Sequence, residues 1–259
     1  MPGRMADRVA LITGGGGGIG EATGRLFAEE GGRIALVDVD RPAVEAAAVG
    51  IAAAVPGAEV LPLVADLAHE AEARRVVDDT AKRFGALHCL INVAGVRLYA
   101  PLGEAEAKDW EHILGVNVLA AAYCCKAALP RLRAAGGGTI VNLSSVYGVM
   151  GRAGMGQYDT TKAAILGFTR ALAVEEATHG VRVNAVCPGG TITPYHLRRA
   201  ASQGVSEAEL RRSRSDDNLL GRWAEPREVA YAILFLACEE SSFMTGTTLM
   251  VDGGRGVRS

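Results

Sequence analysis

The sequence lacks a strong excess of charge of either sign, which argues against two classes of partner. Its 259 residues carry a formal net charge of −2, and the sequence pI is about 6.2. Proteins that bind nucleic acid or an anionic membrane through charge usually present a basic excess or a basic patch. The arginine pairs at 198–199 and 211–212 have acidic residues nearby, so we interpret them as solvated helix faces. We therefore expect no nucleic-acid partner and no membrane partner.

Cysteine is sparse, and its spacing suits neither a disulfide framework nor a metal site. The five cysteines are odd in number and contain no C-x-x-C pair, which favours free thiols in a reducing compartment. The five histidines are scattered and contain no H-x-x-x-H pair, so we expect no metal centre.

Long apolar runs and a signal peptide are also missing from the sequence. No apolar stretch approaches the ~20 residues that a membrane-spanning helix needs. The start of the chain is polar and too short for a signal peptide. We therefore expect a soluble, cytoplasmic protein.

Short apolar runs alternate with longer helical patterns along the chain. Buried strands separated by helices are typical of a parallel sheet covered on both faces, so the pattern predicts an α/β fold. Right-handed crossovers then give a doubly wound, Rossmann-type sheet of about seven strands, with its ligand beyond their carboxyl ends. The predicted strands are Val9–Thr13, Arg33–Asp38, Glu59–Ala65, Leu87–Val93, Thr139–Leu143, Val181–Cys187 and Thr248–Val251, and the predicted helices are 19–30, 41–54, 70–84, 106–134, 157–178 and 225–237.

We expect a single dinucleotide-binding and catalytic domain over residues 1–259, because no segment resembles a linker between domains. Gly136–Gly138 is interpreted as the break between a helix and the next strand. The polar segment near 193–222 begins with Thr193 and Pro194, and we interpret it as a lid over the substrate.

Five consecutive glycines, Gly14–Gly18, follow the first predicted strand and precede the first helix. Glycine allows positive φ and a close approach of the backbone to a pyrophosphate. The N-terminus of the helix adds N–H groups and partial positive charge for the phosphates. The run fits several registers, so it assigns no role to each glycine by itself. In this position it predicts a dinucleotide-binding loop.

The second predicted strand ends at Asp38. A carboxylate at this place binds the ribose hydroxyls of NAD and repels the 2′-phosphate of NADP. Gly15 puts no basic side chain in the loop, and Asp38 and Asp40 lie between Arg41 and the strand. We therefore expect NAD as the cofactor in preference to NADP.

Tyr158 and Lys162 stand four residues apart, which places both on one face of a predicted helix. A cation beside a phenol lowers the phenol pKa from about 10, so the tyrosine can act as a general acid/base. A hydroxyl such as that of Ser145 can hold the oxygen that exchanges its proton with the tyrosine. The pair alone is a weak signal, because an ordinary amphipathic helix can carry the same spacing.

Several short motifs occur together in one order. They are Thr13-Gly-x-x-x-Gly18-Ile-Gly20, Asn92-Val-Ala94-Gly95, Asn117, Ser145, Tyr158-x-x-x-Lys162, Pro188-Gly189 and Val251-Asp-Gly-Gly254. In this order and spacing the chain resembles the short-chain dehydrogenase/reductase (SDR) family, in its classical subgroup, over about residues 9–254. One departure is Val93, which stands where the family often has a second asparagine before Ala-Gly.

The resemblance implies a role for each residue of the predicted catalytic set. Tyr158 would be the acid/base, and Lys162 would lower its pKa and hold the nicotinamide ribose. Ser145 would position the alcohol or carbonyl oxygen of the substrate. Asn117 would anchor a water that links Lys162 to solvent. Ser144 is the competing hydroxyl, and the family interval to the tyrosine favours Ser145.

The resemblance also implies a set of cofactor-binding residues and a quaternary structure. The set is Gly14, Gly18, Ile19, Gly20, Asp38, Asp66, Leu67, Asn92, Ala94, Gly95, Tyr158, Lys162, Pro188, Gly189, Thr191 and Thr193. Structural alternatives remain, because Asn92 and Asn117 could satisfy buried backbone groups and Asp66 could cap a helix. The implied assembly is a homotetramer in which the helix carrying Tyr158 and the preceding helix pack across a two-fold axis.

We expect the substrate pocket to be built by residues just after the fourth, fifth and sixth strands. The predicted substrate contacts are Ser145, Tyr158, Val96, Tyr147 and Tyr195. The tyrosines suit a ring or a medium-sized apolar group. Arg97 and Arg152 could meet an acidic substrate, but we interpret both as surface charges.

The predicted activity is reversible hydride transfer between a secondary alcohol and NAD, as in an alcohol or dihydrodiol dehydrogenase. One alternative is a 3-oxoacyl-thioester (acyl-carrier-protein) reductase, because the end of the chain also resembles those enzymes. They generally prefer NADPH, so cofactor preference separates the two. A remote alternative is a non-catalytic dinucleotide-sensing or scaffold protein.

Overall fold

The computed structural model describes residues 3–213 and 217–257. Its centre is one seven-stranded sheet with the order β3-β2-β1-β4-β5-β6-β7, in which all pairs are parallel. The strands are β1 (Val9–Thr13), β2 (Arg33–Asp38), β3 (Val60–Val64), β4 (Cys89–Asn92), β5 (Gly138–Leu143), β6 (Val181–Pro188) and β7 (Thr248–Val251). The predicted doubly wound α/β fold is thus confirmed.

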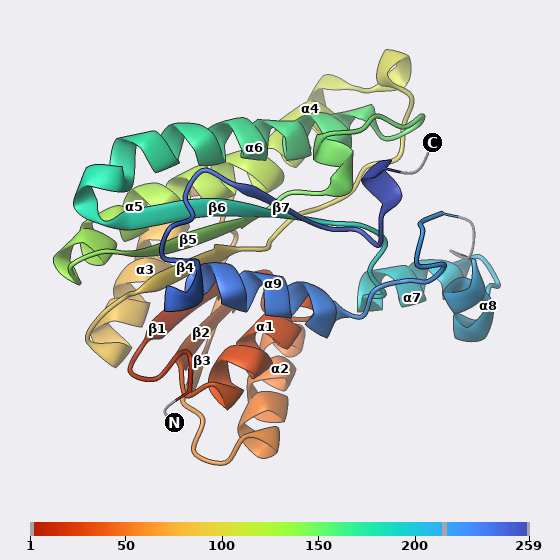
Figure 1. Cartoon of the computed structure of the whole chain (residues 1–259). Helices are drawn as coiled ribbons and strands as arrows, with labels where there is room; N and C mark the ends of the chain where they lie inside the picture. The colour runs from red at the N-terminus through yellow and green to blue at the C-terminus, as the bar shows by residue number, and fades with distance from the viewer. Residues whose placement is uncertain (1–2, 214–216, 258–259) are drawn as a thin grey trace.

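Helices cover both faces of this sheet. They are α1 (Gly18–Glu29), α2 (Arg41–Ala54), α3 (Glu70–Phe84), α4 (Ala107–Leu114), α5 (Ala120–Ala134), α6 (Gly156–Glu176), α7 (Pro194–Ser202), α8 (Glu207–Arg212) and α9 (Pro226–Ala237). Helices α1, α2 and α9 pack on one face, and α3, α5 and α6 pack on the other (Figure 1).

The strands are apolar on both sides because both faces of the sheet are buried. In β1, Ala10 and Ile12 join the core beneath α1, α2 and α9, while Val9 and Leu11 join the core beneath α3, α5 and α6. All four side chains are fully buried. A continuous apolar run is therefore what this position in the sheet requires.

The strand order reverses between β1 and β4. The chain builds outward from β1 to β3, returns to β4, and then builds outward in the other direction. Loops that leave these two strands diverge to opposite faces of the sheet, and a ligand crevice forms between them at the carboxyl edge. The topology thus places a site where the glycine loop and the segment after β4 meet.

The predicted helix 106–134 is helical throughout, but it is not regular. A π-helical turn, Gly115–Leu119, joins α4 to α5, and Asn117 lies inside it. Single π turns inserted in α-helices occur frequently at functional sites. The sequence did not reveal this interruption, because the apolar pattern continues through it.

The stretch Ala107–Ala134 is long and apolar enough to cross a membrane by length and composition, contrary to the expectation that no stretch approaches that size. Core helices of soluble proteins pass the same test. Here Cys124, Ala128 and Leu132 of α5 pack into the core between α3 and the sheet. Burial against the sheet accounts for part of the apolar composition of this stretch.

The predicted lid segment 193–222 contains two short helices that we did not predict. Helices α7 and α8 project beyond the edge of the sheet (Figure 1). Helix α8 begins with a capping box in which Ser206 and Glu209 bond each other's backbone N–H groups, and such a Ser-x-x-Glu pattern is readable in sequence. Residues 214–216 of the predicted lid lie outside the described residues.

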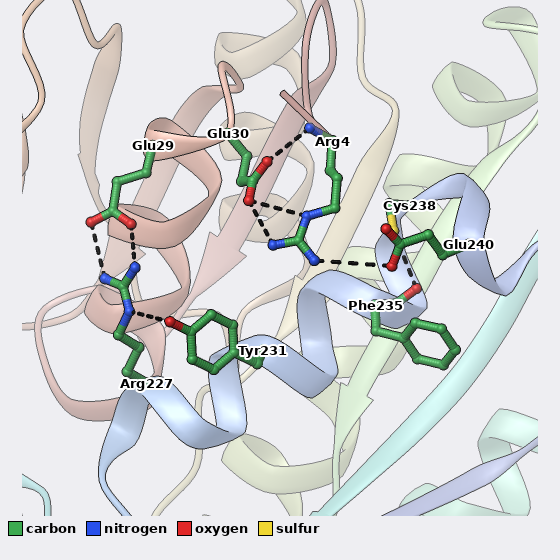
Figure 2. A network of polar contacts seen from close by, with 8 residues as sticks. All are labelled: Arg4, Glu29, Glu30, Arg227, Tyr231, Phe235, Cys238 and Glu240. Atoms are coloured by element: carbon green, nitrogen blue, oxygen red, sulfur yellow. Dashed lines mark hydrogen bonds and ion pairs between the residues drawn. The ribbon is translucent and has the colours of Figure 1, made fainter. Parts of the chain in front are cut away.

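Ion pairs reinforce the packing of α9 on α1. Arg227 of α9 donates hydrogen bonds to both carboxylate oxygens of Glu29 on α1, and Arg4 pairs with the neighbouring Glu30 (Figure 2). Since these side chains are partly exposed, such a pair contributes at most about 1 kcal/mol. The buried apolar face shared by the two helices, rather than the ion pairs, therefore holds them together.

Candidate active site

The residues predicted to be functional gather at the carboxyl ends of β1, β4 and β5. Thr13 ends β1, Asn92 ends β4, and Ser145 follows β5. Helix α6 carries Tyr158 and Lys162 in its first two turns. The sheet topology thus brings side chains from distant parts of the sequence to one edge.

The glycine loop is shaped by contacts that leave no room for side chains. Gly14 and Gly18 have φ values of +66° and +56°, a conformation that favours glycine. A Cβ atom at Gly20 would lie 2.0 Å from the carbonyl oxygen of Gly14, so any larger residue would displace the loop. Helix α1 begins at Gly18 and presents its N-terminal N–H groups at the loop. Ile19 is partly buried against the neighbouring core.

Asp38 is fixed beside the glycine loop by two backbone hydrogen bonds. Its Oδ2 accepts from the N–H of Gly16 at 3.0 Å, and its Oδ1 accepts from the N–H of Asp40 at 3.1 Å. Arg41, the nearest basic residue in sequence, is directed to Glu45 with an Nη1–Oε1 distance of 3.1 Å. The carboxylate therefore lies at the rim of the loop without a basic partner from α2.

Thr13 is a structural residue of the site that we did not predict individually. Its Oγ1 accepts hydrogen bonds from the N–H groups of Val93 and Ala94 at 3.0 and 3.1 Å. This hydroxyl ties the end of β1 to the turn after β4. A Cβ at Gly14 would lie 3.0 Å from the Ala94 backbone, so the two loops run in direct contact.

Asn92 is directed into the core and not toward the loop. Its Nδ2 donates to Oδ1 of Asn142 on β5 at 2.9 Å, and Asn142 donates in turn to Oγ1 of Thr169 on α6 at 3.0 Å. The predicted alternative was backbone satisfaction, but the partner is a side chain. Asn142 is absent from the predicted set because it belongs to none of the sequence motifs. Only its place near the end of a strand could have indicated a role.

Asn117 fastens the π turn to the segment that follows β4. Its Oδ1 accepts from the N–H of Val96 at 2.7 Å, and its Nδ2 donates to the carbonyl oxygen of Val96 and to Oγ1 of Thr161, both at 3.0 Å. Asn117 thus does satisfy buried backbone groups, as one alternative held. Its Oδ1 retains a second lone pair that a water could use.

The two neighbouring serines after β5 have different partners. Ser144 donates its hydroxyl to the carbonyl oxygen of Lys162 at 2.7 Å, which anchors α6 to the strand end. Ser145 caps the next turn by accepting from the N–H of Tyr147 at 3.1 Å. The hydroxyl of Ser145 is also in hydrogen-bond contact with the phenol of Tyr158. Only the second serine therefore reaches the tyrosine through its side chain.

Lys162 is buried with its ammonium group held close to the tyrosine. Its Nζ donates to the carbonyl oxygen of Leu143 at 2.8 Å and lies 5.7 Å from the centre of the Tyr158 ring. A Cβ at Gly95 would lie 3.5 Å from this Nζ and 3.3 Å from Oδ1 of Asn117. Burial lowers the pKa of the Lys162 ammonium, and the neighbouring phenol opposes that shift.

The electrostatic surroundings of Tyr158 favour its deprotonated form. Burial raises the pKa of the phenol, but Lys162 and Arg97 pull it down, and the net pKa lies below its ordinary value. The hydrogen bond with Ser145 and the charge of Arg152 lower the pKa of Tyr158 further. A phenol whose pKa is lowered gives up its proton more readily than an ordinary tyrosine, as a tyrosine acting as a general acid/base must.

Arg97 and Arg152 are not surface charges, and our interpretation of them was wrong. The Cζ atom of each lies 5.4 Å from the centre of the Tyr158 ring. Arg152 stacks on the Tyr147 ring at 3.6 Å and pairs with Asp159 at 3.2 Å. Arg97 lies in the segment after β4 and Arg152 in the segment between β5 and α6, and a charged residue in such a connection gives no sequence signal for whether it turns inward.

The predicted substrate contacts line the outer side of Tyr158. Val96 and Tyr158 belong to a small apolar cluster with Ile113. Tyr147 lies beneath Arg152, as described above. Tyr195 comes from α7 and donates its hydroxyl to that of Tyr99 at 3.2 Å. The surroundings of Tyr158 thus combine aromatic rings with guanidinium groups.

The two residues predicted to border an adenine ring lie just after β3. Leu67 is buried, whereas Asp66 is exposed. The alternative role of Asp66 as a helix cap was wrong, because the N-cap residue of α3 is His69. Its Oδ1 instead accepts from the N–H of Ala68 at 3.0 Å and closes a local turn.

The segment after β6 is held against the end of the chain. Pro188 ends β6, and a Cβ at Gly189 would lie 2.8 Å from the Cα of Asp252. Thr191 pairs with Ala224 through an isolated bridge. Thr193 is the N-cap residue of α7, and its hydroxyl lies 2.8 Å from Nδ1 of His196.

Comparison with known proteins identifies relatives over the full length of the chain. The model of a family described as enoyl-(acyl carrier protein) reductase matches residues 15–255. Cis-4-hydroxycyclohexanecarboxylate dehydrogenase of Sinomonas cyclohexanicum is 38% identical over 251 residues, which cover 96% of this chain and 97% of the relative. The 3-oxoacyl-[acyl-carrier-protein] reductase FabG of Thermotoga maritima is 35% identical and covers 97% and 98%. The crystal structure of L-sorbose reductase from Gluconobacter frateurii, complexed with NADPH and L-sorbose, has a TM-score of 0.94, 30% identity and 100% coverage of both chains.

We predict that the phenol of Tyr158 titrates below the usual pKa of about 10. The readout is the ultraviolet phenolate absorbance of the wild type minus that of Tyr158→Phe, followed against pH. Lys162→Met should move the midpoint upward, because it removes the strongest opposing cation. Lys126→Met, a change at an exposed lysine, should leave it in place. A wild-type midpoint at or above 10 would contradict the prediction.

Proposed function

The protein belongs to the short-chain dehydrogenase/reductase family, and we propose that it interconverts a secondary alcohol and a ketone with NAD as the hydride carrier. The observation that carries the proposal is the buried phenol of Tyr158, with a lowered pKa, beside Lys162 and Ser145. A site built only to bind a dinucleotide has no need of such a phenol.

The residues around the glycine loop fit a nicotinamide dinucleotide. The loop from Gly14 to Gly18 itself contributes no side chain in front of the N-terminus of α1, which favours the approach of phosphates to its N–H groups. Asp38 stands at the rim where a ribose would lie. The predicted cofactor-binding residues therefore form three groups. The first is the glycine loop, and the second is the strand ends that position this loop. The third is the segment Pro188–Thr193, which would lie at the nicotinamide end.

Tyr158 and Ser145 would handle the substrate oxygen in both directions. In oxidation, the Tyr158 phenolate takes the hydroxyl proton, and Ser145 donates a hydrogen bond that stabilises the charge developing on oxygen. When bound, NAD supplies the acceptor for the carbinol hydrogen, which leaves as hydride. In reduction, Tyr158 returns the proton to the oxygen of the ketone.

Lys162 and Asn117 would connect the tyrosine to solvent. Lys162 holds its ammonium beside the phenol and can contact the ribose of the cofactor. A water on the remaining lone pair of Asn117 Oδ1 would lie near Lys162 Nζ, since both atoms approach Gly95. The proton taken by Tyr158 would then reach solvent by way of Lys162 and this water.

Asp38 supports NAD over NADP. The 2′-phosphate of NADP would meet a fixed carboxylate, and Arg41 is already engaged by Glu45. The solved L-sorbose reductase carries NADPH, so family membership alone leaves the cofactor open. The charge at the loop rim is thus the basis for the assignment.

A 3-oxoacyl-thioester reductase is the second candidate. It is favoured by the family model's description and by the similarity to the reductase of Thermotoga maritima. The relative from Sinomonas cyclohexanicum is named for a ring alcohol, which suits the aromatic walls here. We place the alcohol dehydrogenase first because Asp38 disfavours NADPH, on which such reductases generally depend.

The segment 193–222 is proposed to be a lid over the substrate. Helix α7 brings Tyr195 and His196 to the site, where they contact Tyr99 and Arg97. These contacts join the segment to the loop after β4 across the opening. Closing the segment would therefore exclude water from the reacting groups.

A homotetramer is proposed from two separate apolar surfaces. One is a hollow on α5 and α6, and it is lined by Ala122, Cys125, Lys126, Leu129, Pro130, Arg133, Phe168 and Leu172. The other, between α9 and β7, presents Phe243, whose side chain is fully exposed. Two different self-complementary surfaces generate a tetramer with two-fold axes.

Tyr158→Phe should lose most turnover and keep its affinity for NAD. Removing a general acid/base typically costs about 10²- to 10⁴-fold in rate, while the ring and its packing remain. Steady-state kcat and the Kd for NAD measure the two effects. Tyr231→Phe makes the same chemical change on α9 and should be silent. The role assigned to Tyr158 fails if the variant keeps more than about a tenth of wild-type kcat.

Asp38→Asn should lower kcat/KM with NAD and raise it with NADP. Loss of a charged hydrogen-bonding partner costs roughly 10- to 100-fold, and the repulsion of a 2′-phosphate disappears. Asp40→Asn is the matched control, because Asp40 caps α2 and an amide preserves the cap. A wild-type kcat/KM for NADP equal to or above that for NAD would refute the assignment.

Light scattering at micromolar concentration should give four times the chain mass of 26.9 kDa. Leu129→Asp in the hollow on α5 and α6 and Phe243→Asp should each give dimers, because a charge is costly in an apolar interface. Val49→Asp, at an exposed apolar position on α2, should remain tetrameric. A monomeric wild type would reject the proposed assembly.

A further inference from the structure

Arg97 carries a partly buried guanidinium that bonds to no carboxylate among the described residues. Within residues 3–213 and 217–257 it forms no ion pair with a carboxylate, and its hydrogen-bond partners are His196 and the hydroxyl of Tyr99. Its other near neighbours are the rings of Tyr158 and Tyr195, at 5.4 and 5.7 Å from Cζ. A buried charge without a counter-charge is costly.

Other arginines in protected places are compensated. Arg152 is paired with Asp159 at 3.2 Å. Arg182 donates to three carbonyl oxygens, those of Met244, Leu236 and Cys238, at 3.0–3.1 Å. Arg97 differs because none of its partners carries negative charge in its ordinary state. Its position is thus not explained by the internal structure of the fold.

His196 holds Arg97 in place without neutralising it. The Nη1 of Arg97 lies 2.7 Å from Nε2 of His196, and Nδ1 of His196 lies 2.8 Å from Oγ1 of Thr193. A guanidinium only donates hydrogen bonds, so Nε2 must accept and Nδ1 must carry the proton. The imidazole is therefore neutral in this arrangement, and it orients the guanidinium while leaving its charge in full.

The charge of Arg97 lies beside two of the predicted substrate contacts, Tyr158 and Tyr195. The residue follows Val96, which is part of the apolar wall next to Tyr158. The lid helix α7 supplies Tyr195 and His196 from the other side. A substrate whose oxygen reaches Tyr158 and Ser145 would thus have its remaining atoms between these walls, close to Arg97.

We propose that Arg97 binds a carboxylate of the substrate, so that the enzyme acts on hydroxy acids and the corresponding oxo acids. This inference rests on the proposed alcohol–ketone activity and names its substrate class. A planar guanidinium matches a carboxylate through two parallel hydrogen bonds. The bound carboxylate supplies a counter-charge in direct contact with Arg97, which no described residue supplies, and it fixes the distance from the carboxyl carbon to the reacting carbinol.

The rival explanation is that Arg97 serves only to lower the pKa of Tyr158. In that case its charge would assist every alcohol equally, whatever group the alcohol carries. The two explanations are separated by comparing each hydroxy acid with its methyl ester, which has the same carbon skeleton but no charge. Measurement across a range of pH removes the contribution of any change in the titration of Tyr158.

The experiment uses the full-length protein with NAD and four pairs of substrates. The acids are 3-hydroxybutyrate, 4-hydroxypentanoate, and 3- and 4-hydroxycyclohexanecarboxylate, each against its methyl ester. The variants are Arg97→Met, Arg97→Lys and Arg198→Met, and the last is a matched change at an exposed arginine of α7. The readouts are kcat/KM at each pH and the Kd for NAD from fluorescence titration.

The wild type should prefer at least one acid to its ester. Arg97→Met should lower kcat/KM for that acid by about 10- to 100-fold at the pH plateau, which is the cost of losing a charged hydrogen-bonding partner. The ester and the Kd for NAD should be unchanged. Arg97→Lys should recover part of the preference, since it keeps the charge but loses the planar geometry, and Arg198→Met should match the wild type.

Three results would overturn the inference. An equal wild-type kcat/KM for every acid and its ester would refute the carboxylate site at Arg97, but it would not contradict the proposed alcohol–ketone activity. An equal loss on acid and ester in Arg97→Met would assign Arg97 to the tuning of Tyr158, and a matching loss of NAD affinity would assign it to the cofactor. Absence of turnover with every acid, ester and simple secondary alcohol would overturn the proposed function itself, and the inference with it.

Discussion

The hydrogen bond from the buried ammonium of Lys162 to the carbonyl of Leu143 is the contact on which the site depends. It fixes α6 to the carboxyl end of β5, and so it sets where Tyr158 stands relative to the strand ends. A buried ammonium requires compensation, and the carbonyl dipole and the neighbouring phenol provide it. Gly95 lies against this contact, and a Cβ there would be 3.5 Å from Nζ of Lys162 and, more tightly, 3.3 Å from Oδ1 of Asn117.

Hydrogen bonds of neighbouring polar side chains stabilise the position of Lys162 against β5. Ser144 anchors the Lys162 backbone, while Asn142 links β4 to α6 through Asn92 and Thr169. These bonds cross between elements that apolar packing alone would leave free to slide. Groups that are held before substrate arrives need no rearrangement during the reaction, which is the main source of electrostatic catalysis. The rigid sheet therefore acts on the chemistry through a few buried amides and hydroxyls.

The sequence predicted the sheet well and the electrostatics of the site poorly, for one physical reason. A strand buried on both faces must be apolar along its length, so the apolar run Val9–Thr13 by itself indicates a strand that is buried on both faces. The motif residues Ser145, Tyr158 and Lys162 were likewise visible from spacing. Whether Arg97 turns inward depends on α7 and on the loop after β4, which meet only in the folded chain. The π turn at Asn117 was hidden in the same way, since its apolar neighbours continue the helical pattern.

The inward position of Arg97 couples substrate binding to the acidity of Tyr158. In the free enzyme Arg97 and Lys162 both lower the pKa of the phenol. A carboxylate on Arg97 would cancel much of its charge, so the pKa of Tyr158 would rise toward that set by Lys162 and Ser145. A phenol of higher pKa gives up its proton less readily and takes one more readily. Substrate binding would thus strengthen Tyr158 as a base at the moment when a hydroxyl proton has to be removed, while Lys162 keeps the proton mobile.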